Sequence, residues 1–187
     1  TRSERFTRMP AMKTKQSQSG VFLIEALIAI LIFSLGILGM VAMGGSAIAA
    51  QSDAQFRTEA ANFAGDIASK ITLNVDRTSD LLFNASFDSF AHHPVAGAFC
   101  SFAGAASTNA LVSGANEWAD QLHGVVAGVK GLPGAADSHE SIVVDRSLVG
   151  TGQYQVTITV CWKPPSTSAT PLAPWHRHVL VTYVPPL

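Results

Sequence analysis

A single carboxylate, Glu25, lies in a segment that is otherwise free of charge. It is the only charged residue between Val21 and Ser52. A charged side chain at the centre of a bilayer costs roughly 2.5–3.5 kcal/mol on insertion scales, so an acidic group in such a segment indicates a function. The structural alternative is a glutamate that is tolerated near the end of a spanning helix, with its charge in interfacial water.

Histidines are the other residues that could do chemistry, as metal ligands. His176 and His178 can share one face of a strand, but no Cys or acidic residue accompanies them at the spacing of a metal site. The chain also has no phosphate-binding glycine motif, no nucleophile elbow and no evident pair of catalytic carboxylates. We therefore expect no metal site, no cofactor and no catalytic residue, and we expect that the chain is not an enzyme. The six histidines are His92, His93, His123, His139, His176 and His178.

The apolar segment that contains Glu25 is long enough to cross a membrane. Residues 26–52 would span about 40 Å as a helix, and the hydrocarbon core of a bilayer is about 30 Å thick. A secretory signal peptide has an apolar core of only about 7–15 residues, which disfavours that alternative. Basic residues precede the segment, and they predict a cytoplasmic amino terminus and an exported remainder. They are Arg2, Arg5, Arg8, Lys13 and Lys15.

This start of the chain resembles a type IV prepilin. A basic leader ends in Gly20, four apolar residues follow, and Glu25 comes next. In that family a prepilin peptidase cuts after the leader glycine, and the new amino terminus is N-methylated. The resemblance therefore implies cleavage between Gly20 and Val21 and N-methylation of Val21. It also implies that Glu25 pairs with the amino terminus of a neighbouring subunit, as opposite charges attract strongly in apolar surroundings. The phenylalanine that usually follows the cut is second here, as Phe22.

The expected organisation has three parts. The chain begins with Thr1, and Met9 and Met12 are both candidate starts. A start at Met12 leaves a leader of family-typical length, so residues 1–11 are interpreted as lying upstream of the true start. The parts are a leader at 1–20, a transmembrane or filament-core half of a helix at 21–52, and a periplasmic head domain at 53–187.

The long helix is expected to run from Val21 to Asn74, because no proline occurs between Pro10 and Pro94. Its second half is amphipathic. Apolar residues recur there at steps of three and four, which predicts one buried face. They are Phe56, Ala60, Phe63, Ile67 and Ile71.

The remaining elements follow from composition and periodicity. Residues 76–115 are predicted to be an irregular connection, whose phenylalanines Phe83, Phe87, Phe90 and Phe99 pin it onto the domain. A short helix is predicted at 116–129, with Asn116 as its cap and Lys130 at its carboxyl end. Its predicted buried stripe is Trp118, Leu122, Val125 and Val129. Strands are predicted at 141–149, 153–162 and 176–184, and the first two are joined by a hairpin turn at 150–152.

This order resembles a pilin throughout. The resemblance implies an α+β fold in which a long amino-terminal helix packs on a small antiparallel sheet. Trp118, then Leu132-Pro133-Gly134, and a strand that ends in Val160-Cys161-Trp162 are similar to minor pilins of the PilV type.

The two cysteines, Cys100 and Cys161, fall in the exported part, where disulfides persist. We expect them to be bridged, and many minor pilins carry one such bridge. Two unpaired buried thiols are the alternative. Cys161 falls on the polar face of its predicted strand, so a bridge would tie the connection at 76–115 over the outside of the sheet.

The net charge of the processed chain disfavours nucleic-acid binding as a function. Residues 1–20 hold five of the twelve basic and one of the thirteen acidic residues, so the processed chain carries about −5. A mildly acidic exported domain lacks the basic stripe of a nucleic-acid binder. We expect a minor pilin that is processed in the inner membrane, helps to prime pilus assembly and then enters the pilus. Its partners would be other minor pilins, the major pilin, prepilin peptidase, the inner-membrane assembly platform and a tip adhesin. A minor pseudopilin of a type II secretion system and a membrane-tethered periplasmic binding module are the alternatives.

Overall fold

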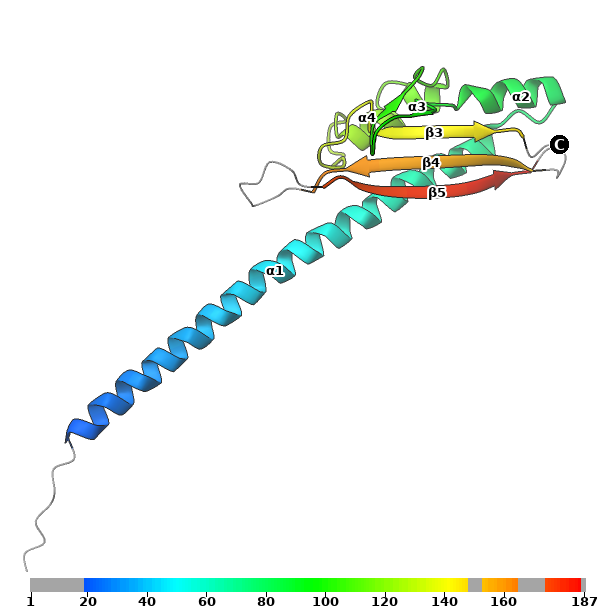
Figure 1. Ribbon diagram of the computed structural model, residues 1–187. Helices are drawn as coiled ribbons and strands as arrows, with labels where there is room; N and C mark the ends of the chain where they lie inside the picture. Colours follow the sequence, from blue (N-terminus) through cyan, green and yellow to red (C-terminus); the bar gives the residue numbers. More distant parts are fainter. Residues whose placement is uncertain (1–18, 148–152, 165–173, 186–187) are drawn as a thin grey trace, which may run out of the picture. The chain divides into compact units, whose positions relative to one another are not determined.

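The computed structural model describes residues 19–147, 153–164 and 174–185. The chain divides into two compact units, residues 1–47 and 48–187, and each is described by itself. The elements in chain order are α1 (Ser19–Asn74), α2 (Asp80–Ser89), β1 (Val95–Ala96), β2 (Phe102–Ala103), α3 (Ala110–Ser113), α4 (Trp118–His123), β3 (Glu140–Asp145), β4 (Tyr154–Trp162) and β5 (His176–Val184) (Figure 1).

Helix α1 confirms the predicted long helix, and it begins two residues earlier than expected. In the second unit, the apolar stripe of α1 packs into the hydrophobic core. Ala60, Ile67 and Ile71 are fully buried there, and Phe63 is half-buried. The three- and four-residue spacing therefore identified the packing face correctly.

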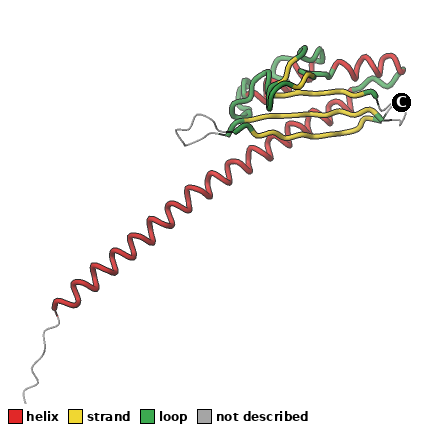
Figure 2. Tube along the Cα trace, viewed as in Figure 1, coloured by secondary structure: helices red, strands yellow, loops and turns green. Residues whose placement is uncertain are grey.

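The main sheet is antiparallel, with strand order β3-β4-β5 (Figure 2). Its central strand, β4, pairs along its whole length with β5, from Tyr154 opposite Val184 to Trp162 opposite His176. The alternation predicted for β4 is confirmed, because the apolar set of residues is buried in the core. That set is Tyr154, Val156, Ile158, Val160 and Trp162.

The predicted strand bounds hold for β5, are one residue early at the start of β4, and hold only in part for β3. Strand β3 covers 140–145, starting one residue before the predicted range and ending before its last residues. The predicted hairpin turn at 150–152 lies outside the described residues. On its other edge β3 forms one isolated bridge, in which His92 and Ile142 exchange two backbone hydrogen bonds of 3.0 and 2.8 Å.

The prediction of an irregular connection at 76–115 was wrong. The segment contains α2, the paired short strands β1 and β2, and α3. Helix α2 begins because the Ser79 hydroxyl accepts a hydrogen bond from the backbone N–H of Leu82, an ordinary N-cap. Phe83 and Phe87, four residues apart, bury the same face of this helix. Phe90 is buried too, whereas Phe99 is 59% exposed, so three of the four phenylalanines pin the segment as predicted.

The helix predicted at 116–129 is much shorter, since α4 covers only 118–123. It ends at Gly124, which has a left-handed φ of 71° and lies against Gly131, where a Cβ on Gly124 would come within 3.0 Å. Asn116 is not the cap. Glu117 occupies the N-cap position, and its side chain accepts no hydrogen bond from the backbone of the first turn. Val125 is 72% exposed, so the predicted buried stripe is reduced to Trp118 and Leu122.

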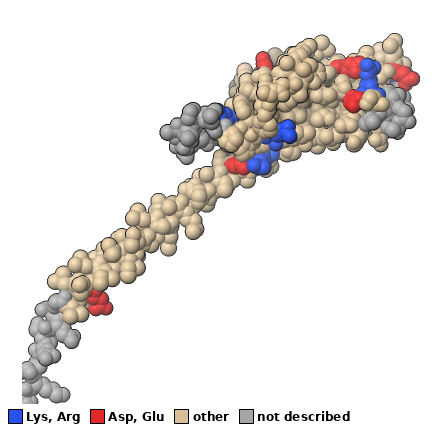
Figure 3. Space-filling view, viewed as in Figure 1, with Lys and Arg blue, Asp and Glu red and all other residues tan. Residues whose placement is uncertain are grey.

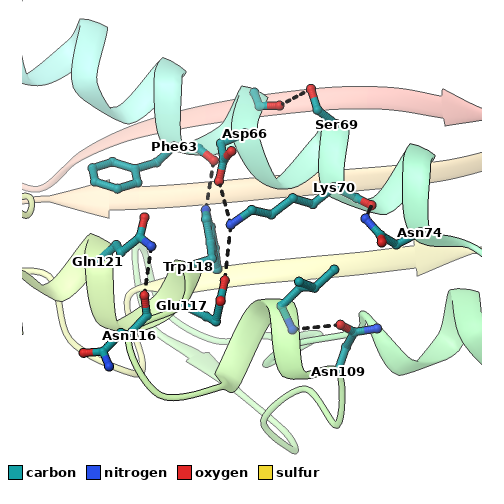
Figure 4. Close-up of polar contacts among 12 residues, drawn as sticks. Phe63, Asp66, Ser69, Lys70, Asn74, Asn109, Asn116, Glu117, Trp118 and Gln121 are labelled. Carbon is teal, nitrogen blue, oxygen red and sulfur yellow. Dashed lines mark hydrogen bonds and ion pairs between the residues drawn. The ribbon is translucent and has the colours of Figure 1, made fainter. Parts of the chain in front are cut away.

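Helix α4 docks on α1 through one hydrogen bond and one shared cation (Figure 4). The indole Nε1 of Trp118 donates to the carbonyl oxygen of Phe63 at 2.9 Å. The ammonium of Lys70 lies 3.2 Å from Asp66 and 3.4 Å from Glu117, and so it bridges the two helices. The whole is an α+β fold of pilin-like architecture, as predicted.

Candidate functional site

The first unit presents an apolar helical surface. Every large apolar residue of α1 from Val21 to Met43 is between 45% and 76% exposed. A window within this helix reaches a mean hydropathy of 2.8, so the helix is long and apolar enough to cross a membrane. Figure 3 shows the amino-terminal part of α1 almost entirely without charge. A soluble monomer rarely exposes so large an apolar surface, so this segment needs lipid or other helices around it.

The uncharged polar groups of this segment are satisfied within the helix. The hydroxyl of Ser34 donates to the carbonyl of Ile30 at 2.7 Å, and that of Ser46 donates to Met43 at 2.8 Å. Such back-bonding hides both hydroxyls from an apolar environment. Gly36 and Gly39 have open space where a Cβ would be, which leaves room for close approach of another helix.

Glu25 is the exception in this segment. Its side chain is exposed on α1, and no ion pair or hydrogen bond to it is found among the residues that the structure describes. Gly20 and Val21 lie in the first turn of the same helix, where backbone N–H groups have no intrahelical acceptor. Val21 is 66% exposed. The predicted cleavage site and Glu25 are therefore neighbours on one short stretch of helix.

The predicted bridge between Cys100 and Cys161 is confirmed. The two Cα atoms lie 5.8 Å apart, and the bonded residues are 61 positions apart in the chain. Cys161 belongs to the outward face of β4, yet it is fully buried, because the segment that carries Cys100 covers it. Arg177 of β5 lies over the neighbouring Phe99 ring, with its guanidinium carbon 5.2 Å from the ring centre. The bridge thus closes the segment 76–115 over one end of the sheet.

A buried carboxylate, Glu140, is the functional group that sequence reasoning missed. It is fully buried at the start of β3, and its Oε1 lies 2.8 Å from Nε2 of His123 and 3.5 Å from Nε2 of His92. A signal for it existed. Glu140 alternates with Ile142 and Val144 on the inward face of the strand, but the predicted strand began one residue too late to include it.

The charged forms of Glu140 and of the neighbouring His123 stabilise each other. Burial by itself would raise the pKa of Glu140, but hydrogen bonds and charge from His123 and His92 hold that pKa below its ordinary value. Burial would likewise lower the pKa of His123, but its hydrogen bond to Glu140, and the charges of Glu140, Asp137 and Asp120, raise that pKa instead. Both pKa shifts favour the charged forms, so the 2.8 Å contact between His123 and Glu140 becomes a charge-assisted hydrogen bond when His123 is protonated.

His176 and His178, the histidine pair singled out in the sequence, lie two positions apart on β5 and so share one face of the strand. His176 lies with its Nδ1 3.1 Å from Oδ1 of Asp53 and 3.4 Å from a guanidinium nitrogen of Arg57, both on α1. This contact attaches the start of β5 to the helix. Sequence spacing could not reveal it, because more than a hundred residues separate the partners along the chain. His178 follows on β5, opposite Val160 of β4.

Comparison with known proteins adds no relative. No protein-family model, curated protein or solved structure matches the chain. What stands is the architecture, a long apolar amino-terminal helix and a small antiparallel sheet, which is compatible with a pilin fold.

Proposed function

We propose that the chain is a minor pilin, a structural subunit that helps to prime type IV pilus assembly. The observation that carries the proposal is Glu25. It is the only charge in the apolar part of a helix whose second half packs on a three-stranded antiparallel sheet. The exposed apolar surface of residues 21–47 supports the same conclusion, because a filament subunit exchanges lipid for neighbouring helices along that surface.

The proposed processing begins at the first turn of α1. Prepilin peptidase would cut between Gly20 and Val21, and Val21 would then carry a methylated ammonium group. This step removes the five basic residues of the leader and creates a new positive charge next to the apolar segment. A subunit in that state has one cation at its start and one anion, Glu25, shortly after it.

The proposed mechanism of recruitment is pairing of these two charges between subunits. In an apolar bundle an unpaired carboxylate or ammonium is strongly destabilising, whereas a pair removes the uncompensated burial of both groups. Pairing therefore favours insertion of a subunit in one axial register, the one that brings Glu25 to a neighbour's amino terminus. No catalytic step belongs to this role.

The proposed setting is the inner membrane, with the amino terminus in the cytoplasm and the head in the periplasm before entry into the pilus. The disulfide fits an oxidising compartment. Other minor pilins and the major pilin would contact the apolar helix. Prepilin peptidase and the inner-membrane assembly platform would act on the subunit before assembly, and a tip adhesin is a further partner.

The test is Glu25→Ala, expressed at the normal level in a strain that lacks the native gene. The monomer should still enter the membrane, since the costly charge is gone. Assembly should fail, because a neighbour's ammonium group would be left unpaired at a cost of about 3–5 kcal/mol. Surface filaments are counted, and the other minor pilins are recovered by pull-down. We expect co-purification to fall by roughly a hundredfold or more.

Two controls make the result specific. Glu25→Asp keeps the charge and should retain part of the assembly, while Glu59→Ala removes a carboxylate from the head part of the same helix and should leave assembly intact. Normal piliation and normal co-purification in Glu25→Ala would overturn the proposed mechanism. Genes for a type II secretion system beside this one, with secretion rather than piliation lost in the variant, would assign the chain to a pseudopilin instead.

A further inference from the structure

His123, the last residue of α4, has a carboxylate on each side of its ring. Its Nε2 lies 2.8 Å from Oε1 of Glu140, the first residue of β3. Its Nδ1 lies 3.6 Å from Oδ1 of Asp137, in the loop before that strand. We propose that His123 is a pH-sensitive contact, which ties α4 to β3 more strongly when mild acid protonates its ring. The proposal does not depend on the pilin assignment, because every residue in it belongs to the head unit.

The placement of the two carboxylates favours a protonated ring. A neutral imidazole has one N–H, so it donates on one side and presents a lone pair on the other. If the N–H of His123 faces Glu140, the lone pair faces the carboxylate of Asp137, and that contact is repulsive. The imidazolium has an N–H on both nitrogens and attracts both carboxylates. The geometry therefore stabilises an added proton on His123.

Glu140 gains most from the positive charge. Its side chain is completely buried, and its Oε2 has no hydrogen-bond partner among the described residues. A buried carboxylate is costly unless it is paired. The side chain of His123 is only 10% exposed, so little water screens the contact between the two groups. A charged donor at this distance compensates Glu140 more strongly than a neutral donor does.

A second histidine, His92, faces the same carboxylate but is not the group that takes up the proton. Its Nδ1 accepts a hydrogen bond from the backbone N–H of Ser107 at 3.0 Å. In the neutral ring the proton is therefore on Nε2, which lies 3.5 Å from Oε1 of Glu140. A proton added to Nδ1 would have to replace the bond to Ser107. His92 thus supports Glu140 as a neutral ring, and the added proton goes to His123.

The other charged groups around His123 act in the same direction, with one exception. Burial alone would lower the pKa of His123, but the hydrogen bond and charge of Glu140 raise it above the ordinary 6.5. The charges of Asp137 and of Asp120, on α4, add to this rise. His139 is the exception, because a positive charge on it would repel His123. Burial lowers the pKa of His139, so that ring stays neutral at neutral pH.

The sign of the pH dependence follows from these directions. Because the pKa of His123 is higher in the folded head than in the unfolded chain, the folded head binds the proton more tightly. This stabilisation is fully present below the ordinary value of 6.5 and is lost as pH rises through the higher folded value. The lowered pKa of Glu140 adds stability that is fully present above its ordinary 4.5 and is lost in stronger acid. The contact is therefore strongest in mild acid.

The experiment uses the full chain in detergent micelles. Nuclear magnetic resonance follows the histidine ring signals from pH 5 to 9, and denaturant unfolding is compared at pH 6 and pH 8. His123→Gln keeps a side-chain donor but removes the titrating ring. Asp137→Asn removes one of the two carboxylates, and its side chain is 90% exposed, so the fold should not change. His178→Gln is the matched control, because it removes a histidine from β5.

We expect the ring of His123 to titrate with a midpoint above 6.5, and Asp137→Asn to lower that midpoint. The unmodified chain and His178→Gln should unfold at a higher denaturant concentration at pH 6 than at pH 8. This difference should be reduced in His123→Gln. A ring of His123 that titrates at or below 6.5 would overturn the proposal, and so would equal pH dependence in His123→Gln and His178→Gln. If His123→Gln does not fold, the ring titrations of the unmodified chain and of Asp137→Asn decide.

Discussion

Trp118 carries much of the attachment of α4 to α1. Its ring is fully buried, and its Nε1 donates to the carbonyl of Phe63, so both the apolar and the polar part of the side chain are used. Buried tryptophans usually find such a partner for the indole N–H. The ring supplies most of the stabilisation, since a single neutral hydrogen bond contributes only about 0.5–1.5 kcal/mol net.

Two substitutions should separate these contributions. Trp118→Phe keeps an aromatic ring but loses the donor, and it should lower the free energy of unfolding of the head by about 1–2 kcal/mol. Trp118→Ala leaves a cavity and should lower it by about 3–5 kcal/mol. Denaturant unfolding of the full chain in detergent, followed by circular dichroism, measures both values. Val125→Ala is the control and should change little, because Val125 is 72% exposed. Equal losses in Phe and Ala variants would show that the hydrogen bond, not the ring, dominates.

At the scale of elements, the segment between α1 and α4 is held at several separate places. Phe83 and Phe87 pack against Tyr154 of β4, with ring centres 4.7 and 5.4 Å from it. The isolated β-bridge between His92 and Ile142 continues the sheet beyond the outer edge of β3. The disulfide joins Cys100 of the segment to Cys161 of β4. Short elements such as β1 and β2 have little stability of their own, so this segment depends on these attachments.

Removing the disulfide should therefore destabilise the head strongly. With the two cysteines 61 positions apart, the chain-entropy model gives on the order of 4 kcal/mol. We expect the Cys100→Ala, Cys161→Ala double variant to lose about 2–4 kcal/mol in denaturant unfolding. Periplasmically made protein should also resist alkylation when no reductant is present. Modification of both cysteines under those conditions, seen by intact mass, would contradict the bridge. Reduced unmodified protein is the control, and it should unfold at a similarly low denaturant concentration.

At the scale of the whole molecule, two kinds of surface occur in one chain. The first unit exposes apolar side chains almost without interruption, and the second buries its apolar residues in a core shared by α1, α2, α4 and the sheet. The first unit therefore requires an apolar environment, while the second carries a folded core of its own. That combination is expected of a protein that has one part in a membrane and another outside it.

The prediction at this scale concerns which residue begins the processed chain. Mass spectrometry of protein extracted from membranes should identify N-methylated Val21 as the first residue. A strain without prepilin peptidase should retain the leader through Gly20, and Gly20→Ala should slow cleavage less than a bulkier substitution because the peptidase must admit the side chain. An intact leader in cells with active peptidase would contradict the assignment as a prepilin.

Patterns among neighbouring residues predicted the long helix α1 and the strands β4 and β5 well. They predicted the short helices α2 and α4 poorly. Helix α1 and strands β4 and β5 followed from absence of proline and from alternation, which are properties of neighbouring residues. Helix α2 was missed although Phe83 and Phe87 have helical spacing, because the abundance of Ser, Ala and Gly over residues 76–115 indicated an irregular connection. Helix α4 was predicted too long, because Gly124 ends it through a close approach to Gly131 that no local pattern shows.

The sequence by itself determined the apolar helix, the isolated charge at Glu25, the buried face of β4 and the α+β class. Each of these depends on residue type and on spacing within a few positions, and the hydrophobic effect acts on such patterns directly. Only the tertiary structure decided that Glu140 meets His123 and His92, and that His176 reaches Asp53. Those contacts join residues from different elements, so they exist only once the helices and the sheet have packed around one core.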